Sequence, residues 1–435
     1  MSPIQASCIV LSILIPGELG RYICHVQRRW NASSILVVVM ALTVAFPLAI
    51  GHLVGGVYRV MTQMGPVLVL SRPIEILNSA CVAALVLLSL IIVLGGIRNG
   101  RMITASSAGL IAIVGLNVIN DIFAGAPGLP PRRVALIAVL LAAGTGPRNA
   151  GVARPGVLKG GALAGLTLAW LNFLVGAMTP LTASVSCRDE KCGLFDQLFT
   201  GAYGNENAVG LSAALTVPFV LLAIDGRQKL RLVAYLIFLQ LLSGNRTGLL
   251  ASTIAVLGWF GLRSVRVPIR RMRLGLATLS LVTLAALLAP FLGLTGLTGR
   301  PELWQQAMRM LRSSPLFGLS HSEWSNLADI SGGFGRAASY SVHNLFLDVA
   351  FGGGLVALSI FLAVFCLISV RCARQDGLAS VLLITVAVIG IAERPWSLDT
   401  IDWLTWTLIA VIALAGQAPH GDTSKVAEGA QSKRC

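Results

Sequence analysis

The chain has 435 residues, of which 55% are hydrophobic and only 12% are charged, and its mean hydropathy is +0.81. A soluble globular protein carries about 25% charged residues, so this composition excludes an ordinary soluble protein. The net charge of +15 would favour nucleic-acid binding in a soluble chain. Here most of the basic residues lie between long apolar runs, so we expect no nucleic-acid partner.

Apolar runs of about 20 residues, long enough to span a bilayer as helices, recur throughout the chain. They predict an all-α fold, a polytopic helical membrane protein with about 12 transmembrane helices in a single integral membrane domain over residues 1–435. The expected spans are 33–52, 76–97, 103–124, 133–147, 160–182, 207–224, 231–243, 249–262, 274–296, 343–370, 378–393 and 402–417. The shorter run 4–16 is expected to be an interfacial or short extra helix.

The basic residues also predict the orientation of the chain in the membrane. Most Lys and Arg fall in alternate connections, above all in 263–273, and cytoplasmic connections of membrane proteins carry such an excess. This places both termini in the cytoplasm and the loop 297–342, the main extracytoplasmic loop, outside it. Membrane lipids are therefore expected partners.

Cys187 and Cys192 lie close together in an outer connection. On an oxidising face this spacing could close a small disulfide. A metal pair is the alternative, but no neighbouring His completes a ligand set, so we favour the disulfide and predict no metal.

Two polar segments flank outer helix starts. Asn205-Glu206-Asn207 could cap a helix, or could form a polar cluster that contacts sugar hydroxyls, and both interpretations stay open. Arg246, in Ser243-Gly244-Asn245-Arg246-Thr247, could reach lipid head groups. Its glycine-rich, polar surroundings favour a guanidinium that binds an anion beside free backbone amides.

The main extracytoplasmic loop begins with Gly299-Arg300 and Trp304 and ends with His343-Asn344. A histidine at a membrane boundary is a site hypothesis by default, and its ordinary pKa suits proton transfer. The alternative is that His343 only caps a helix. Arg309 and Arg312 share one helical face and are better explained as a solvated stripe, while Glu393-Arg394 is either an acid–cation pair beside the site or a surface pair.

Taken in order, Asn207-Ala208-Val209-Gly210-Leu211, Ser243 to Thr247, Gly299-Arg300 with Trp304, and His343-Asn344 resemble the motifs of the O-antigen ligase and polymerase-like family. These bacterial membrane enzymes transfer or polymerise polyprenyl-linked glycans. The resemblance covers roughly residues 195–370. This chain departs from the family where Asn205-Glu206-Asn207 replaces the usual His-Pro-Asn.

The resemblance implies a glycosyltransferase at the outer face of the bacterial cytoplasmic (inner) membrane. Its partners would be an undecaprenyl-diphosphate-linked glycan donor and a glycan, lipid or protein acceptor with a free hydroxyl. His343, Arg246 and Arg300 are the expected catalytic residues, with His343 either a general base or a hydrogen-bond donor. The donor diphosphate would contact Arg246, Arg300 and Arg336, and Asn344, Trp304 and Asn207 would support the site.

No acidic metal-binding motif lies near the loop, so we expect no cofactor and a metal-independent reaction in which arginines replace the cation. Within the family the sequence does not separate a ligase from a polymerase. A transporter or flippase of the same lipid is a further alternative, although we find no internal repeat of the transporter kind. A non-catalytic membrane scaffold is the third.

Overall fold

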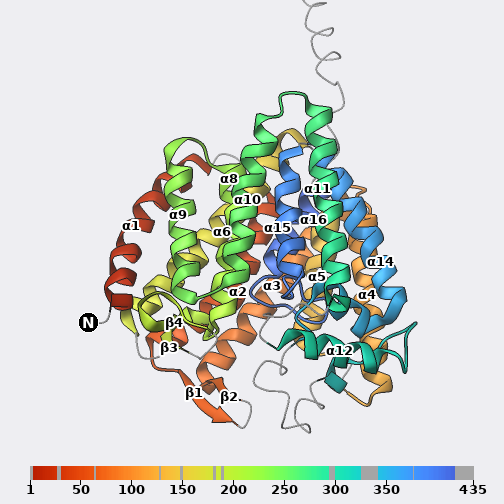
Figure 1. Ribbon diagram of the computed structural model, residues 1–435, viewed down its shortest axis with the longest axis horizontal. Coiled ribbons are helices and arrows are strands. Elements are labelled where there is room, and N and C mark those ends of the chain that lie inside the picture. Colours follow the sequence, from red (N-terminus) through yellow and green to blue (C-terminus); the bar gives the residue numbers. More distant parts are fainter. Residues whose placement is uncertain are drawn as a thin grey trace, which may run out of the picture.

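In the computed structural model of the chain the described residues are 3–26, 31–62, 65–126, 129–146, 150–179, 183–187, 191–292, 299–324, 341–375 and 377–416. Most of them form a bundle of helices (Figure 1). The α-helices are α1 (Pro3–Val26), α2 (Ala32–Leu53), α3 (Arg72–Arg98), α4 (Ala105–Phe123), α5 (Pro131–Gly144), α6 (Ala150–Met178), α8 (Glu206–Ala223), α9 (Gly226–Ser243), α10 (Arg246–Ser264), α11 (Pro268–Leu288), α12 (Arg300–Leu311), α14 (Leu345–Gln375), α15 (Ser380–Gly390) and α16 (Thr405–Ala415).

Seven helices within the described residues are long and apolar enough to cross a membrane, which confirms the all-α membrane class. They are Ala32–Leu53, Arg72–Arg98, Ala105–Phe123, Pro155–Met178, Glu206–Ala223, Pro268–Phe291 and Leu345–Gln375. Each of the twelve predicted spans overlaps a helix, but the count of twelve crossings is not confirmed. Helices α15 and α16 have 11 residues each, which rise only about 16 Å.

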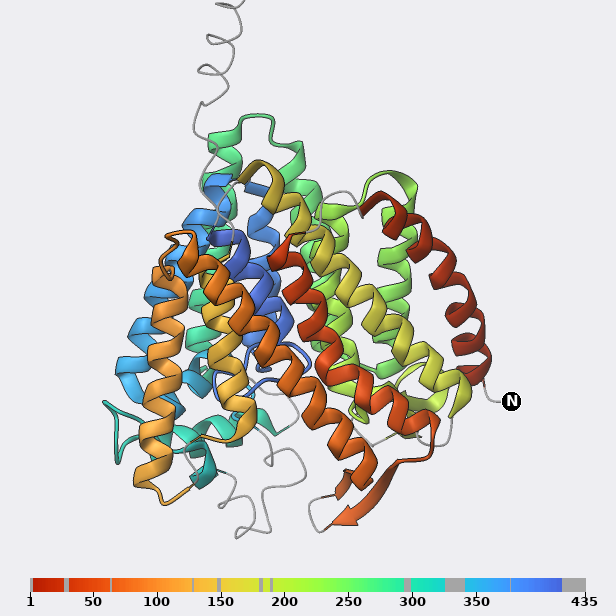
Figure 2. The ribbon, with the colours of Figure 1, turned by 180° about the vertical axis from the view of Figure 1, so that it is seen from behind.

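The short apolar run near the N-terminus belongs to the 24-residue helix α1, so it is not a short element by itself. Helix α1 lies at the edge of the bundle beside α6 (Figure 2). Two side-chain hydrogen bonds join the helices, from Gln5 to the Ala177 carbonyl (3.4 Å) and from the indole of Trp170 to the Ser12 carbonyl (3.1 Å).

Two small antiparallel sheets were not predicted from the sequence. Strand β1 (Val57–Thr62) pairs with β2 (Gly65–Leu70), and β3 (Ser184–Ser186) pairs with β4 (Gln197–Phe199). Both sheets lie at the same end of the bundle as α12, which we call the α12 end, while the basic turn between α10 and α11 lies at the opposite end (Figure 1). The α12 end is the one that the charge pattern assigns to the outside.

Helix α14 is broken near its start, where Gly353 and Gly354 leave helical geometry. The break admits the backbone that follows α12, because a side chain at Gly354 would clash with the Leu316 carbonyl. The Leu319 amide then bonds to the Phe351 carbonyl at 2.7 Å, so a backbone group freed by the break regains a partner.

The connection between α15 and α16, residues 391–404, is irregular yet largely buried. Its Glu393, Trp396 and Leu398 are at most 4% exposed. Buried irregular backbone needs partners for its carbonyl groups. Asn117 donates to the Leu398 carbonyl and Arg133 to the Asp399 carbonyl, both at 3.0 Å, so helices α4 and α5 hold this connection in place.

Candidate active site

Three charged side chains from separate parts of the chain meet at the α12 end. Glu393 accepts a hydrogen bond from the Arg300 guanidinium through one carboxylate oxygen. Its other oxygen lies 2.9 Å from Nδ1 of His343. We call Arg300, His343 and Glu393 the Glu393 cluster. Glu393 is 4% exposed, while the side chains of Arg300 and His343 keep 15% and 17% exposure. Arg300 and His343 therefore face outward from a buried acid.

His343 has an unusual backbone conformation. Its φ is +54°, in the left-handed region that non-glycine residues rarely enter. The next residue, Asn344, is fully buried and caps α14 by accepting hydrogen bonds from the amides of Phe346 (3.1 Å) and Leu347 (2.9 Å). Strained residues often mark functional sites, where the surrounding structure holds them in place.

Asn344 also connects three elements that surround the cluster. Its side-chain amide donates to the carbonyl of Ala286 in α11 (2.9 Å) and to that of Ile391, two residues before Glu393 (3.0 Å). The start of α14 and the buried connection 391–404 are thereby fixed to each other. This explains how His343 and Glu393 come into contact although 50 positions separate them.

Arg300 is the first residue of α12, after Gly299 in left-handed geometry. A cation at a helix N-terminus is opposed by the helix dipole, so the contact with Glu393 compensates for an unfavourable position. Trp304, predicted to support the site, is fully buried and packs with Leu303, Ala307 and Phe351. It therefore supports the position of α12 from inside and presents no surface to a ligand.

The electrostatics of Glu393 follow from these contacts. Burial raises the pKa of its carboxyl group, whereas the charge and hydrogen bond of His343 and the charge of Arg300 lower it. Lys191 adds a smaller effect in the lowering direction. The net result is a pKa below the ordinary value of 4.5, so Glu393 is ionised at neutral pH.

Arg246 begins α10, and its side chain is exposed. The preceding Asn245 caps this helix and also donates from its side-chain amide to the carbonyl and the side-chain oxygen of Asn207, at 3.2 and 3.3 Å. Asn207 in turn accepts a hydrogen bond from Lys191 at 2.6 Å. Arg246 is thus connected, through its neighbour, to the lysine whose charge acts on Glu393.

In the segment Asn205-Glu206-Asn207 the structure shows the capping role, while a contact with sugar hydroxyls stays a prediction. Asn205 caps α8, because its side chain accepts hydrogen bonds from the amides of Asn207 (2.8 Å) and Ala208 (3.2 Å). Glu206 and Asn207 belong to a polar cluster, since both contact the Lys191 ammonium. Lys191 itself follows the segment 188–190 and was not singled out from the sequence.

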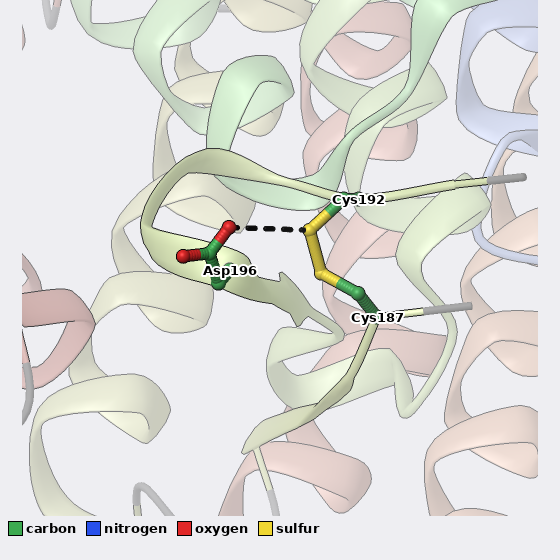
Figure 3. Close-up of a disulfide and its surroundings, with 3 residues drawn as sticks. All are labelled: Cys187, Cys192 and Asp196. Atoms are coloured by element: carbon green, nitrogen blue, oxygen red, sulfur yellow. Dashed lines mark hydrogen bonds between the residues drawn. A yellow bond between two sulfur atoms is a disulfide. The ribbon is translucent and has the colours of Figure 1, made fainter. Parts of the chain in front are cut away.

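The structure joins Cys187 and Cys192 in a disulfide whose Cα atoms are 4.7 Å apart (Figure 3). A carboxylate oxygen of Asp196 lies 4.0 Å from the Cys192 sulfur. The backbone from Cys192 to Asp196 forms a tight turn, in which Phe195 and Asp196 have positive φ. The disulfide thus anchors the short connection that carries Lys191.

A second histidine–carboxylate contact lies on α14. Asp348 is 3% exposed and accepts a hydrogen bond from the Arg394 guanidinium at 3.4 Å. The same carboxylate lies 3.6 Å from Nε2 of His321. Arg394 directly follows Glu393, so this contact fixes the connection 391–404 beside the Glu393 cluster. Neither Asp348 nor His321 was identified from the sequence.

The remaining predicted residues divide simply. Arg336 lies outside the described residues, as do residues 297–298 and 325–340 of the main loop. Arg309 is exposed and donates to Gln306 (2.6 Å), in keeping with a solvated stripe. Among the described residues no group of three or more His, Cys, Asp and Glu side chains could hold a metal ion.

The fold and the site define a helical membrane protein with an arginine-rich and histidine-containing polar site at one end of its bundle. Residues 232–362 of the chain match the family model described as O-antigen ligase, which confirms the resemblance and supports an O-antigen ligase-like family. The matched region contains Arg246, Arg300 and His343 but ends before Glu393. A comparison with curated proteins found no match.

Proposed function

We propose that the protein is a membrane glycosyltransferase that moves a glycan from an undecaprenyl-diphosphate donor to an acceptor hydroxyl at the outer face of the bacterial cytoplasmic membrane. The observation that carries this proposal is the Glu393 cluster, in which one buried carboxylate holds an arginine and a histidine side by side. An anionic leaving group and a hydroxyl to be deprotonated need these two kinds of side chain.

Arg300 and Arg246 act on the leaving diphosphate. The bond between the first sugar and the diphosphate breaks, and negative charge develops on the departing oxygen. Guanidinium groups bind phosphate oxygens in pairs and stay charged at every working pH. A well-placed cation in a site of low dielectric accelerates such a step by about 10²–10³-fold.

His343 acts on the acceptor. Its Nδ1–H donates to the Glu393 carboxylate, which leaves the basic lone pair of the neutral ring on Nε2. Nε2 takes the proton of the acceptor hydroxyl while the hydroxyl oxygen attacks the anomeric carbon. Glu393 fixes the ring orientation and stabilises the imidazolium that forms. A single displacement of this kind inverts the anomeric centre and requires no metal ion.

A transfer assay tests the proposal. Purified protein in detergent receives a labelled undecaprenyl-diphosphate glycan and an acceptor in the presence of a chelator. Wild type should release undecaprenyl diphosphate together with a new glycoconjugate, and His343→Ala should not, while Arg309→Ala serves as the matched control. Loss of wild-type transfer in the chelator would contradict metal independence.

The assay also separates the alternatives. A ladder of longer glycans would identify a polymerase, whereas one product of defined length would identify a ligase. If, in vesicles, the intact donor only changed leaflet, the protein would be a lipid transporter and the arginines would form its binding site.

A further inference from the structure

Cys192, which closes a small ring with Cys187, and the following Gly193 pack against the turn that precedes Arg246. Gly244, in that turn, has φ +62°, and a Cβ atom there would lie 2.7 Å from the Cys192 carbonyl oxygen. On the other side, a Cβ at Gly193 would clash with the Leu242 carbonyl. The backbone of residues 192–193 therefore packs directly against the backbone of the α9–α10 turn, which fixes the two segments relative to each other.

Lys191 precedes Cys192 in this ring, and its side chain contacts the first residues of α8. Its ammonium donates to the side-chain oxygen of Asn207 at 2.6 Å and contacts the Glu206 carboxylate at 3.3 Å. Its side chain is only 17% exposed. A lysine that only solvates a membrane protein surface has no need of such burial, since its flexible stem readily reaches water.

Lys191 interacts with both parts of the site, through Asn207 with the start of α10 and Arg246, and by its charge with the Glu393 cluster. On one side, Asn207 is bonded to Asn245, the neighbour of Arg246. On the other side, the positive charge of Lys191 lowers the pKa of Glu393, with a smaller effect than the charges of His343 and Arg300.

We propose that Lys191, held in place by the Cys187–Cys192 ring, is a third cation of the donor-diphosphate site, between Arg246 and the Glu393 cluster. This inference rests on the proposed function. Lysine binds phosphate as a compact point charge, which complements the paired contacts of guanidinium groups. The ring matters because it fixes the one short connection that presents the ammonium.

Binding of undecaprenyl diphosphate to the purified protein under non-reducing conditions tests the inference. Lys191→Ala should weaken binding about 10- to 100-fold, the loss expected for a hydrogen bond to a charged group. Arg309→Ala removes an exposed cation at the same end of the bundle and should bind like wild type. Equal binding by Lys191→Ala and wild type would overturn the inference and leave the proposed function standing.

Glu206→Gln separates a binding role of Lys191 from a merely structural ion pair. If the pair only holds the connection together, losing either partner should weaken diphosphate binding. If the ammonium binds the ligand, Glu206→Gln removes a competing negative charge and should tighten binding. Weaker binding in both variants would overturn the inference.

Reduction tests the part played by the ring. Dithiothreitol should weaken binding in wild type. The double variant Cys187→Ser and Cys192→Ser should bind equally weakly in the absence of dithiothreitol. In Lys191→Ala dithiothreitol should have no further effect, because the two changes remove one interaction and are not additive. An additive loss would show that the ring acts through something other than Lys191. If wild type neither binds nor transfers, the proposed function itself fails.

Discussion

Two clusters of charged side chains lie at the α12 end, and they are built in opposite ways. In the Glu393 cluster a buried acid lies between two basic side chains, Arg300 and His343, that are partly exposed, at 15% and 17%. In the second, which we call the Arg133 cluster, the buried Arg133 stands between Asp121 and Asp399. Its Arg133 and Asp121 side chains are only 4% and 7% exposed.

The difference separates a site from its support. Arg133 uses its guanidinium on Asp121 at 2.6 Å and on the backbone and side chain of Asp399, so its donors face protein groups. Those contacts hold the connection 391–404, which carries Glu393. The outward-facing basic side chains of the Glu393 cluster are accessible to a ligand, whereas the inward-facing Arg133 holds the connection 391–404 in position.

The largest effect on stability is expected from breaking the Arg133 cluster. Arg133→Ala leaves the buried Asp121, and the partly exposed Asp399, without their arginine, which costs about 3–5 kcal/mol of folding free energy. The loss can be measured as a lower melting temperature in detergent and less folded protein in the membrane. Arg132→Ala is the matched control, because Arg132 is the neighbour of Arg133 in sequence but is exposed. Unchanged melting of Arg133→Ala would contradict the supporting role.

Breaking the Glu393 cluster should have the converse result. Arg300→Ala removes a cation aimed at the leaving group, and transfer should fall about 10²–10³-fold. The amount of folded protein should stay near the wild-type value, since Glu393 retains His343. Single-turnover transfer and a melting curve measure the two quantities on one preparation. A variant that loses stability and activity together would place Arg300 with the supporting residues.

The acid in the centre of the Glu393 cluster gives a dependence on pH. Because its pKa is lowered in the folded protein, ionised Glu393 stabilises the fold above the ordinary value of 4.5. This contribution is lost as the pH falls through the lowered pKa. The melting temperature of wild type should therefore fall on acidification below pH 4.5, and that of Glu393→Gln should fall less. Parallel curves for the two proteins would show that Glu393 is not the titrating group.

The sequence allowed prediction of the long helices and of the residues at the two described ends of the main loop. Both follow from local signals, namely apolar length and a polar motif at a helix start. Arg300 and His343 were found this way. Glu393 was named only as part of a Glu393-Arg394 pair, either beside the site or on the surface. Its contacts with Arg300 and His343 were not predicted, because it lies 93 positions from Arg300.

Local sequence signals did not predict the irregular parts of the fold. The sequence of the connection 391–404 resembles the ends of two membrane spans, because its Trp396 and Leu398 are apolar. Its backbone carbonyl groups are satisfied by residues distant in sequence, such as Asn117, which local signals do not indicate. Asp121 looked like a helix-end residue, and only the tertiary contact with Arg133 makes it part of a buried cluster. The burial of Trp304 was not predicted, because nothing in the sequence distinguishes a buried aromatic side chain from an exposed one.

The smallest effect expected concerns Arg246, which belongs to neither cluster. Arg246→Lys keeps the charge at the start of α10 but loses the planar pair of donors that matches a phosphate. If the contact is bidentate, transfer should fall about tenfold, equivalent to 1.4 kcal/mol, with the loss mainly in donor KM. Arg309→Lys is the control for a lysine introduced elsewhere at the α12 end. Full activity of Arg246→Lys would mean that only charge matters there, and Arg246 would then resemble Lys191 more closely than Arg300.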